Sequence, residues 1–177
     1  MKITLRIWRQ PAADQPGRYE RHGLADVSPD VSLLEALDQL NEQLISAGQR
    51  PVSFEHDCRE GICGSCGFLV NGQAHGPRRA TSVCQLYLRE FEDGAELTLE
   101  PWRAKAFPAI QDLMVDRSSL DRLIAAGGYC STGTGQAPDG NALPVGRGRA
   151  TSAVSTATGI GCGACVASCR NASASLF

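Results

Sequence analysis

Cysteine is the residue type through which this sequence can do chemistry, and it occurs eight times in 177 residues. Seven cysteines fall into two clusters, which are Cys58, Cys63, Cys66 and Cys84, and then Cys162, Cys165 and Cys169. Cys130 stands alone at no ligand spacing, and we predict a small buried thiol there. The N-terminus alternates like a strand and shows no apolar block before a cleavage site, so we expect no secretory signal and a reducing compartment. Clustered thiols in such a compartment indicate metal binding rather than a disulfide framework.

The first cluster has the spacing of a plant-type [2Fe–2S] site: Cys58-x4-Cys63-x2-Cys66, with Cys84 seventeen residues further on. Such a site takes three thiolates from one loop that wraps the cluster closely, and the fourth from a separate element. Glycines suit this loop because they remove side-chain bulk and allow positive φ, and it contains Gly61, Gly64 and Gly67. Zinc also takes four cysteines, but zinc sites usually pair two short knuckles. The spacing therefore favours a [2Fe–2S] cluster over zinc and over unligated thiols.

The second cluster reads Gly159-x2-Cys162-x2-Cys165-x3-Cys169, which is bacterial-ferredoxin spacing with glycine at the first position. Two cysteines cannot firmly hold a cubane, and no aspartate or histidine follows residue 139 to replace the missing thiolate. These cysteines are therefore either relics and weak metal ligands, or members of clusters that something else completes. The chain's three histidines lack the paired His/Cys pattern of a Rieske centre and are predicted to be hydrogen-bonding groups in loops: His22, His56 and His75.

Residues 1–100 carry signals for a helix and several strands, and these elements could position the first cluster. Ser32 and Glu35 have the spacing of a capping box, and leucines at helical spacing follow up to Leu44. Gly48 can supply a left-handed stop, so we expect a helix over residues 33–47. Alternation and turn signals predict strands over residues 1–10, 18–25, 52–54, 68–70, 83–88 and 95–100. Together they indicate a compact mixed α/β unit.

The second part of the chain gives weaker signals. Apolar spacing from Leu113 to Ile124, closed by Gly127, suggests a helix. Residues 131–149 are predicted to form a loop, and residues 145–158 consist mostly of small residues without apolar periodicity. We expect a domain boundary near residues 100–108.

Charge and hydropathy exclude two classes of protein. The formal net charge is −2, from 17 basic and 19 acidic residues, so the strongly basic surface of a nucleic-acid binder is absent. No run approaches the roughly 18 apolar residues of a membrane span, and we expect the chain not to cross a membrane itself.

The loop from His56 to Val70, HDCREGICGSCGFLV, closely resembles the cluster loop of the iron–sulfur subunit of succinate dehydrogenase/fumarate reductase. Matches to the same family continue in order at residues 74–77, 84–86, 100–104, 107–108, 115–118, 127–129 and 137–139. The resemblance extends from the N-terminus to about residue 145 and resumes from Gly159 to the end.

This resemblance implies an α+β fold, in which a β-grasp [2Fe–2S] ferredoxin-like domain over residues 1–104 precedes an incomplete all-α bacterial-ferredoxin-like domain over residues 105–177. It assigns the first four cysteines to [2Fe–2S], Cys162 and Cys165 to [4Fe–4S], and Cys169 to [3Fe–4S]. The ligand sets of the last two clusters are incomplete, and a truncated product or a corrupted reading of the gene would explain this.

The resemblance also implies a function as the electron-transfer subunit of an oxidoreductase of the tricarboxylic acid cycle. Such a subunit relays electrons one at a time between an FAD-containing flavoprotein subunit and quinone at a membrane anchor, and has no substrate-converting site. It would lie peripherally on the cytoplasmic face of the membrane. The alternatives are a free-standing [2Fe–2S] ferredoxin-like carrier and an inactive fragment.

Overall fold

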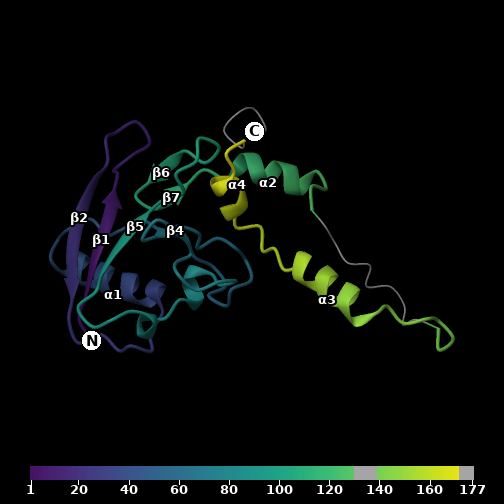
Figure 1. Ribbon diagram of the computed structural model, residues 1–177. Helices are drawn as coiled ribbons and strands as arrows, with labels where there is room; N and C mark the ends of the chain where they lie inside the picture. Colours follow the sequence, from purple (N-terminus) through teal and green to yellow (C-terminus); the bar gives the residue numbers. More distant parts are fainter. Residues whose placement is uncertain (130–138, 172–177) are drawn as a thin grey trace.

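A five-stranded mixed sheet forms the centre of the computed structural model, which describes residues 1–129 and 139–171 (Figure 1). Its strands, in spatial order, are β2 (Arg18–Leu24), β1 (Ile3–Arg9), β5 (Glu96–Glu100), β3 (Leu69–Val70) and β4 (Gln73–Ala74). β1 and β5 pair in parallel, and the other neighbours are antiparallel. The strands predicted over residues 1–10, 18–25, 68–70 and 95–100 are thereby confirmed.

The core lies between this sheet and helix α1 (Leu33–Ser46). Alternation in β1 buries Ile3, Leu5 and Ile7, and the parallel register sets Leu5 beside Leu97. The predicted capping box is present: the Glu35 amide donates to Ser32 Oγ at 3.3 Å, and the Ser32 amide donates to the Glu35 carboxylate at 2.6 Å. Six residues of α1 are buried, which are Leu33, Leu34, Ala36, Leu37, Leu40 and Leu44. Burial of this stripe fixes the helix on the sheet.

Two predicted strands are wrong. Residues 83–88 form parts of two 3₁₀ turns, η1 (Val83–Gln85) and η2 (Leu88–Glu90), because local bonds such as that from the Leu86 amide to the Val83 carbonyl replace a strand ladder. Residues 52–54 also form no strand. The Val52 amide donates to Asn41 Oδ1 and the Ser53 amide to the Asp112 carboxylate, so side chains take the bonds that a neighbouring strand would have made.

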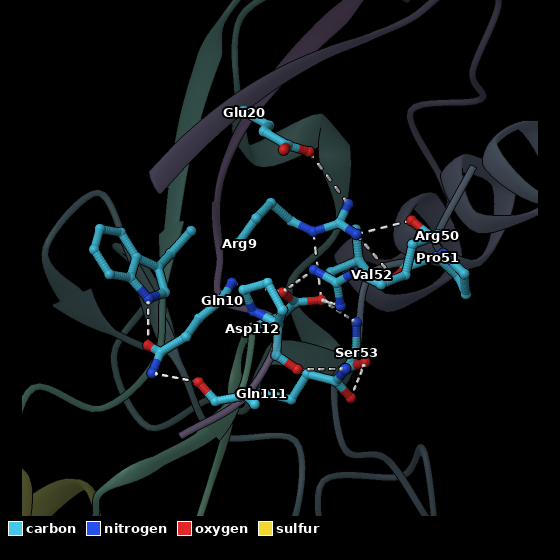
Figure 2. A network of polar contacts seen from close by, with 12 residues as sticks. Arg9, Gln10, Glu20, Arg50, Pro51, Val52, Ser53, Gln111 and Asp112 are labelled. Carbon is cyan, nitrogen blue, oxygen red and sulfur yellow. Dashed lines mark hydrogen bonds and ion pairs between the residues drawn. The ribbon is translucent and has the colours of Figure 1, made fainter. Parts of the chain in front are cut away.

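The small hairpin of β6 (Ala109–Gln111) and β7 (Met114–Val115) packs back on the N-terminal unit. Leu113, which the periodicity assigned to a helix, lies in this hairpin and is buried in the main core. Asp112 at the turn is fully buried and binds the backbone amides of Gln10 and Ser53 at 2.8 and 2.9 Å (Figure 2). The hairpin therefore ties the end of β1 to the segment that leads into the first cysteine loop.

The remaining described chain contains three helices, which are α2 (Ser118–Ala125), α3 (Arg147–Thr156) and α4 (Ala164–Ser168). α3 begins inside the predicted loop and stands apart from the sheet in Figure 1, with no buried residue, in agreement with its lack of apolar periodicity. α2 and α4 contribute side chains to a second small core formed by Trp102, Phe107 and Val115. The structure thus confirms a mixed sheet with a few helices, as in a ferredoxin-like unit.

No helix in residues 1–129 or 139–171 is both long and apolar enough to span a membrane. Cys130 and residues 131–138 of the predicted loop lie outside the described residues.

Candidate metal centre

Cys58 is the first cysteine of its loop, and several backbone amides donate hydrogen bonds to its sulfur. Its Sγ accepts hydrogen bonds from the amides of Glu60, Ile62 and Cys63 at 3.3, 3.4 and 3.3 Å. These amide hydrogen bonds, that of Glu60 first, lower the pKa of the Cys58 thiol to about 7, because hydrogen bonds to the charged form stabilise it. The loop is therefore shaped to hold a thiolate, which is the form of cysteine that binds metal.

The other three cysteines of the first cluster lie in the same neighbourhood. Cys66 and Cys84 are buried, and burial raises the pKa of the Cys66 thiol to about 11. Hydroxyl groups accompany two of the sulfurs, with Ser65 Oγ 3.0 Å from Cys63 Sγ and Ser82 Oγ 3.1 Å from Cys84 Sγ. Three cysteines of the first cluster thus lie in one loop and the fourth in a 3₁₀ turn, and hydrogen-bonding groups contact the sulfurs of Cys58, Cys63 and Cys84.

This all-sulfur donor set fits a two-iron cluster. Among the residues that the structure describes, no three His, Cys, Asp or Glu side chains are grouped as they would be around one metal ion. A [2Fe–2S] cluster does not require three ligands around one metal ion, because each of its irons takes two protein thiolates. The amide donors around Cys58 Sγ and the burial of Cys66 and Cys84 are the hydrogen bonding and desolvation that such clusters use.

The second cysteine segment docks directly on the first loop at Gly64. Gly64 has φ +72°, and a Cβ there would lie 2.4 Å from the Ile160 carbonyl oxygen and 3.0 Å from the Cys162 nitrogen. Only glycine allows both this backbone conformation and this approach. Arg117, just before α2, joins the two segments by donating from Nη1 to the carbonyl oxygens of Gly64 and Cys162 at 2.8 and 3.4 Å.

Of the second cluster, Cys162 lies closest to the N-terminal unit, whereas Cys165 and Cys169 are exposed. Cys162 and Gly159 line an open pocket of about 490 Å³. A Cβ at Gly159 would meet nothing within 4 Å, so the backbone leaves room for a side chain there. The structure therefore brings Cys162 to the first loop but does not gather all three cysteines at one point.

His75 also lines this pocket, and sequence reasoning did not connect it with the cysteines. Its Nε2 lies 3.3 Å from Cys162 Sγ, and its ring meets Trp102 edge-on at 5.3 Å between centroids. Burial lowers the pKa of His75. The prediction of a hydrogen-bonding histidine in a loop is confirmed for His75, with a partner 87 residues away in sequence, whereas His22 lies in strand β2 and not in a loop. No local pattern could have revealed that pair.

Comparison with known proteins gives the family. The profile described as "2Fe-2S iron-sulfur cluster binding domain" matches residues 4–122. The chain belongs to this family. Membership confirms the predicted cofactor of the first cluster, and the matched range holds all four cysteines that the spacing selected.

Curated relatives of this 2Fe-2S domain protein are named as iron–sulfur subunits of fumarate reductase and succinate dehydrogenase, the family that the motifs indicated. It is 31% identical to the fumarate reductase iron-sulfur subunit of Wolinella succinogenes over 117 residues, which are 64% of this chain and 43% of that protein. It is 29% identical to the succinate dehydrogenase iron-sulfur subunit of Bacillus subtilis over 121 residues, covering 67% and 44% of the two chains. The resemblance is therefore confirmed, and the matched region spans less than half the length of these relatives.

A solved structure has a similar fold. A chain of the Mycobacterium smegmatis Sdh1 complex in the apo form matches with a TM-score of 0.68 at 19% identity, covering 98% of this chain and 65% of that one. The 2Fe-2S domain protein therefore resembles about two thirds of that chain in fold.

Proposed function

We propose that this chain is the electron-transfer iron–sulfur subunit of a succinate dehydrogenase or fumarate reductase. The observation that carries the proposal is the first cysteine loop, where three amides point at Cys58 Sγ and Cys66 is buried. Relatives named as subunits of these enzymes match the same part of the chain. The chain would convert no substrate itself.

The proposed ligands of the [2Fe–2S] cluster are Cys58, Cys63, Cys66 and Cys84. A bound cluster would supply one-electron redox chemistry at this loop. The residues around it hold the four sulfurs, donate N–H groups to Cys58 and keep water from Cys66 and Cys84, which are 4% and 5% exposed. Hydrogen bonds and exclusion of water are the means by which a protein sets the potential of such a cluster.

For the C-terminal part, predicted over residues 105–177, we propose an all-α domain of the bacterial-ferredoxin type that begins after the β6–β7 hairpin. Cys162 and Cys165 would serve a [4Fe–4S] cluster and Cys169 a [3Fe–4S] cluster, with further ligands from outside this sequence. The contacts of Asp112 and Leu113 favour counting the β6–β7 hairpin with the first domain, which moves the boundary proposed at residue 104 to a point beyond it.

The proposed partners are an FAD-containing flavoprotein subunit and a membrane anchor that binds quinone, and the proposed location is the cytoplasmic face of the membrane. Ile62 supports a docking surface over the cluster, because this apolar side chain lies between Cys58 and Cys63 and is 65% exposed. An exposed apolar residue at the tip of a cofactor loop is suited to contact another subunit.

Two other functions would use the same first domain. A free-standing [2Fe–2S] carrier would bind the cluster but no flavoprotein, and an inactive fragment would bind neither. Iron and sulfide content separates the fragment from the other two, and co-purification with a flavin-containing chain separates the subunit from the carrier.

The test begins with anaerobic reconstitution of the whole chain. We expect about two irons and two sulfides at the first site, and an EPR signal after reduction. Cys58→Ala and Cys84→Ala should each abolish the signal, and Cys130→Ala is the matched control that should keep it. Co-expression with a flavoprotein of this enzyme class should then give a complex that carries FAD. Stoichiometric zinc without visible absorption would contradict the cluster, and failure to bind the flavoprotein would contradict the subunit role.

A further inference from the structure

Arg59 has an unusual backbone conformation directly after the first cysteine of the loop. Its φ is +55°, in the left-handed region that residues with a Cβ rarely adopt. Such a conformation persists only where the surrounding structure holds it, and it is often found at functional sites. The turn at Arg59 lies between Cys58 and the three amides that point back at Cys58 Sγ. The alignment of these donors therefore depends on what holds Arg59.

Two side chains from other elements bind Arg59. Asp38 of α1 accepts hydrogen bonds from the guanidinium Nη1 and Nη2 at 2.5 and 3.2 Å. Gln85 of η1 donates from Nε2 to the Arg59 carbonyl oxygen at 2.9 Å. The side chains of Arg59 and Asp38 are 37% and 39% exposed, so solvent weakens their ion pair. The Gln85 bond acts on the backbone itself, and it is the contact best placed to hold the left-handed turn.

The neighbours of the Gln85 side chain determine which end of its amide faces the loop. Nε2 lies 2.9 Å from the Arg59 carbonyl oxygen and 3.2 Å from that of Cys84. A carbonyl oxygen only accepts, so the nitrogen of the amide and not its oxygen must lie there. Cys84 Sγ is 3.9 Å from the same nitrogen. One amide group therefore contacts both the Arg59 turn and the fourth cysteine.

The loop also contacts Gln85 at a second point. A Cβ at Gly61 would lie 3.2 Å from Gln85 Cγ and 3.3 Å from Ser82 Oγ, and Gly61 itself has φ +75°. The loop backbone thus packs closely against the stem of Gln85 and against the residue before η1. This packing restricts the rotamers that would withdraw the Gln85 amide from Arg59.

We propose that Gln85 is a positioning residue for the [2Fe–2S] cluster, which holds the left-handed turn at Arg59 and fixes the first cysteine loop against the turn that carries Cys84. The proposal deepens the proposed function and rests on it, because it takes the first four cysteines as the cluster ligands. Without Gln85, the amides at Cys58 Sγ lose their alignment. N–H donors to a ligating sulfur stabilise the reduced cluster, so this loss lowers its reduction potential.

Hydrogen exchange followed by NMR tests the contact in the whole chain without metal. Gln85→Met keeps the length of the side chain and removes the donor. We expect the amides of residues 60–63 to exchange faster in Gln85→Met, while those of α1 keep their protection and show that the fold is intact. Gln43→Met, at an exposed glutamine of α1, is the matched control and should change neither. Unchanged exchange of residues 60–63 in Gln85→Met would overturn the proposal.

Redox titration followed by EPR tests the consequence in the anaerobically reconstituted chain. We expect the potential of the [2Fe–2S] cluster to fall in Gln85→Met and to keep the parent value in Gln43→Met. An unchanged potential in Gln85→Met would contradict the positioning role. A lower potential without faster exchange of residues 60–63 would also contradict it, because the effect would then come from the contact of Gln85 with Cys84 Sγ alone.

The proposed function and the role of Gln85 fail separately. If the reconstituted parent shows no [2Fe–2S] signal, the cluster site is wrong, and with it the claim that Gln85 influences a potential. If the parent binds the cluster but Gln85→Met leaves exchange and potential unchanged, the function stands and the positioning role falls.

Discussion

The guanidinium of Arg50 binds the carboxylate of Asp112 through two parallel hydrogen bonds of 2.9 and 2.8 Å, although 62 residues separate them. Asp112 is fully buried and also faces the buried Arg9, whose Nε lies 3.4 Å from the carboxylate (Figure 2). The two amides that Asp112 also accepts bring the end of β1 and the chain before Cys58 to the same carboxylate.

Asp112→Asn should lower the free energy of unfolding by about 3 kcal/mol, because it removes the charge that neutralises a buried arginine. Asparagine tolerates the positive φ of 46° at this position, so the change tests the charge and not the backbone. Urea unfolding followed by circular dichroism measures the loss. The exposed Asp14→Asn is the control, which should stay within about 0.5 kcal/mol of the parent. Equal stability of the two variants would contradict the importance of this network.

Gly64→Ala should separate the second cysteine segment from the first loop, since the added Cβ would collide with the Ile160 carbonyl oxygen. Hydrogen exchange followed by mass spectrometry should then show faster exchange in peptides that contain Cys162. Gly159→Ala is the matched control, because a Cβ at that position meets nothing within 4 Å. Protection that survives in Gly64→Ala would show that the two segments do not dock as described.

His22 should make stability depend on pH. Its pKa is lowered from 6.5, first by burial and then by the charge of Arg9, with Glu20 opposing. A base whose folded-state pKa lies below its unfolded value takes up protons more readily when unfolded, so stability falls as the pH drops below about 7. His22→Gln should flatten the pH dependence of the urea midpoint between pH 7 and 5. A steeper or unchanged slope in this variant would refute the assignment to His22.

Ile62→Pro should lower the reduction potential of the [2Fe–2S] cluster, because it removes one amide that points at Cys58 Sγ. Ile62→Ala is the control, since it shortens the side chain but keeps the N–H. EPR-monitored redox titration of both reconstituted proteins gives the comparison. If the alanine and proline variants have the same potential, the backbone donor at residue 62 has no influence on the cluster.

Local patterns allowed much of this structure to be predicted. The capping box at Ser32, the leucine stripe of α1 and the alternation of β1 each join residues only a few positions apart, so the sequence alone contains their geometry. The segment at residues 83–88 has the apolar residues of a strand, but it makes an isolated bridge between Tyr87 and Ser32 and otherwise turns locally. Local spacing cannot show whether such a neighbour exists.

The candidate site likewise contains residues that the sequence predicts and residues that only the structure reveals. The first four cysteines were found through their spacing, which a single loop largely fixes. His75 and Arg117 were not connected with the cysteines, because each reaches Cys162 across at least 45 residues of chain. Such contacts arise from the docking of two segments, and this docking depends on packing that no short motif records.

The carboxylate of Asp112 also dictates an order of assembly. Arg9, Arg50 and the Ser53 amide leave the ribosome long before Asp112, and until it arrives they lack their shared acceptor. A fragment that stops at residue 104 would contain every strand of the main sheet and all four cysteines of the first cluster, but its Ser53 amide would lack the Asp112 acceptor. Asn41 and Arg9 would still bind the backbone of residues 50–52, so the loss falls on the last few residues before the cysteine loop. We therefore expect these residues to become fully ordered only after the β6–β7 hairpin has formed.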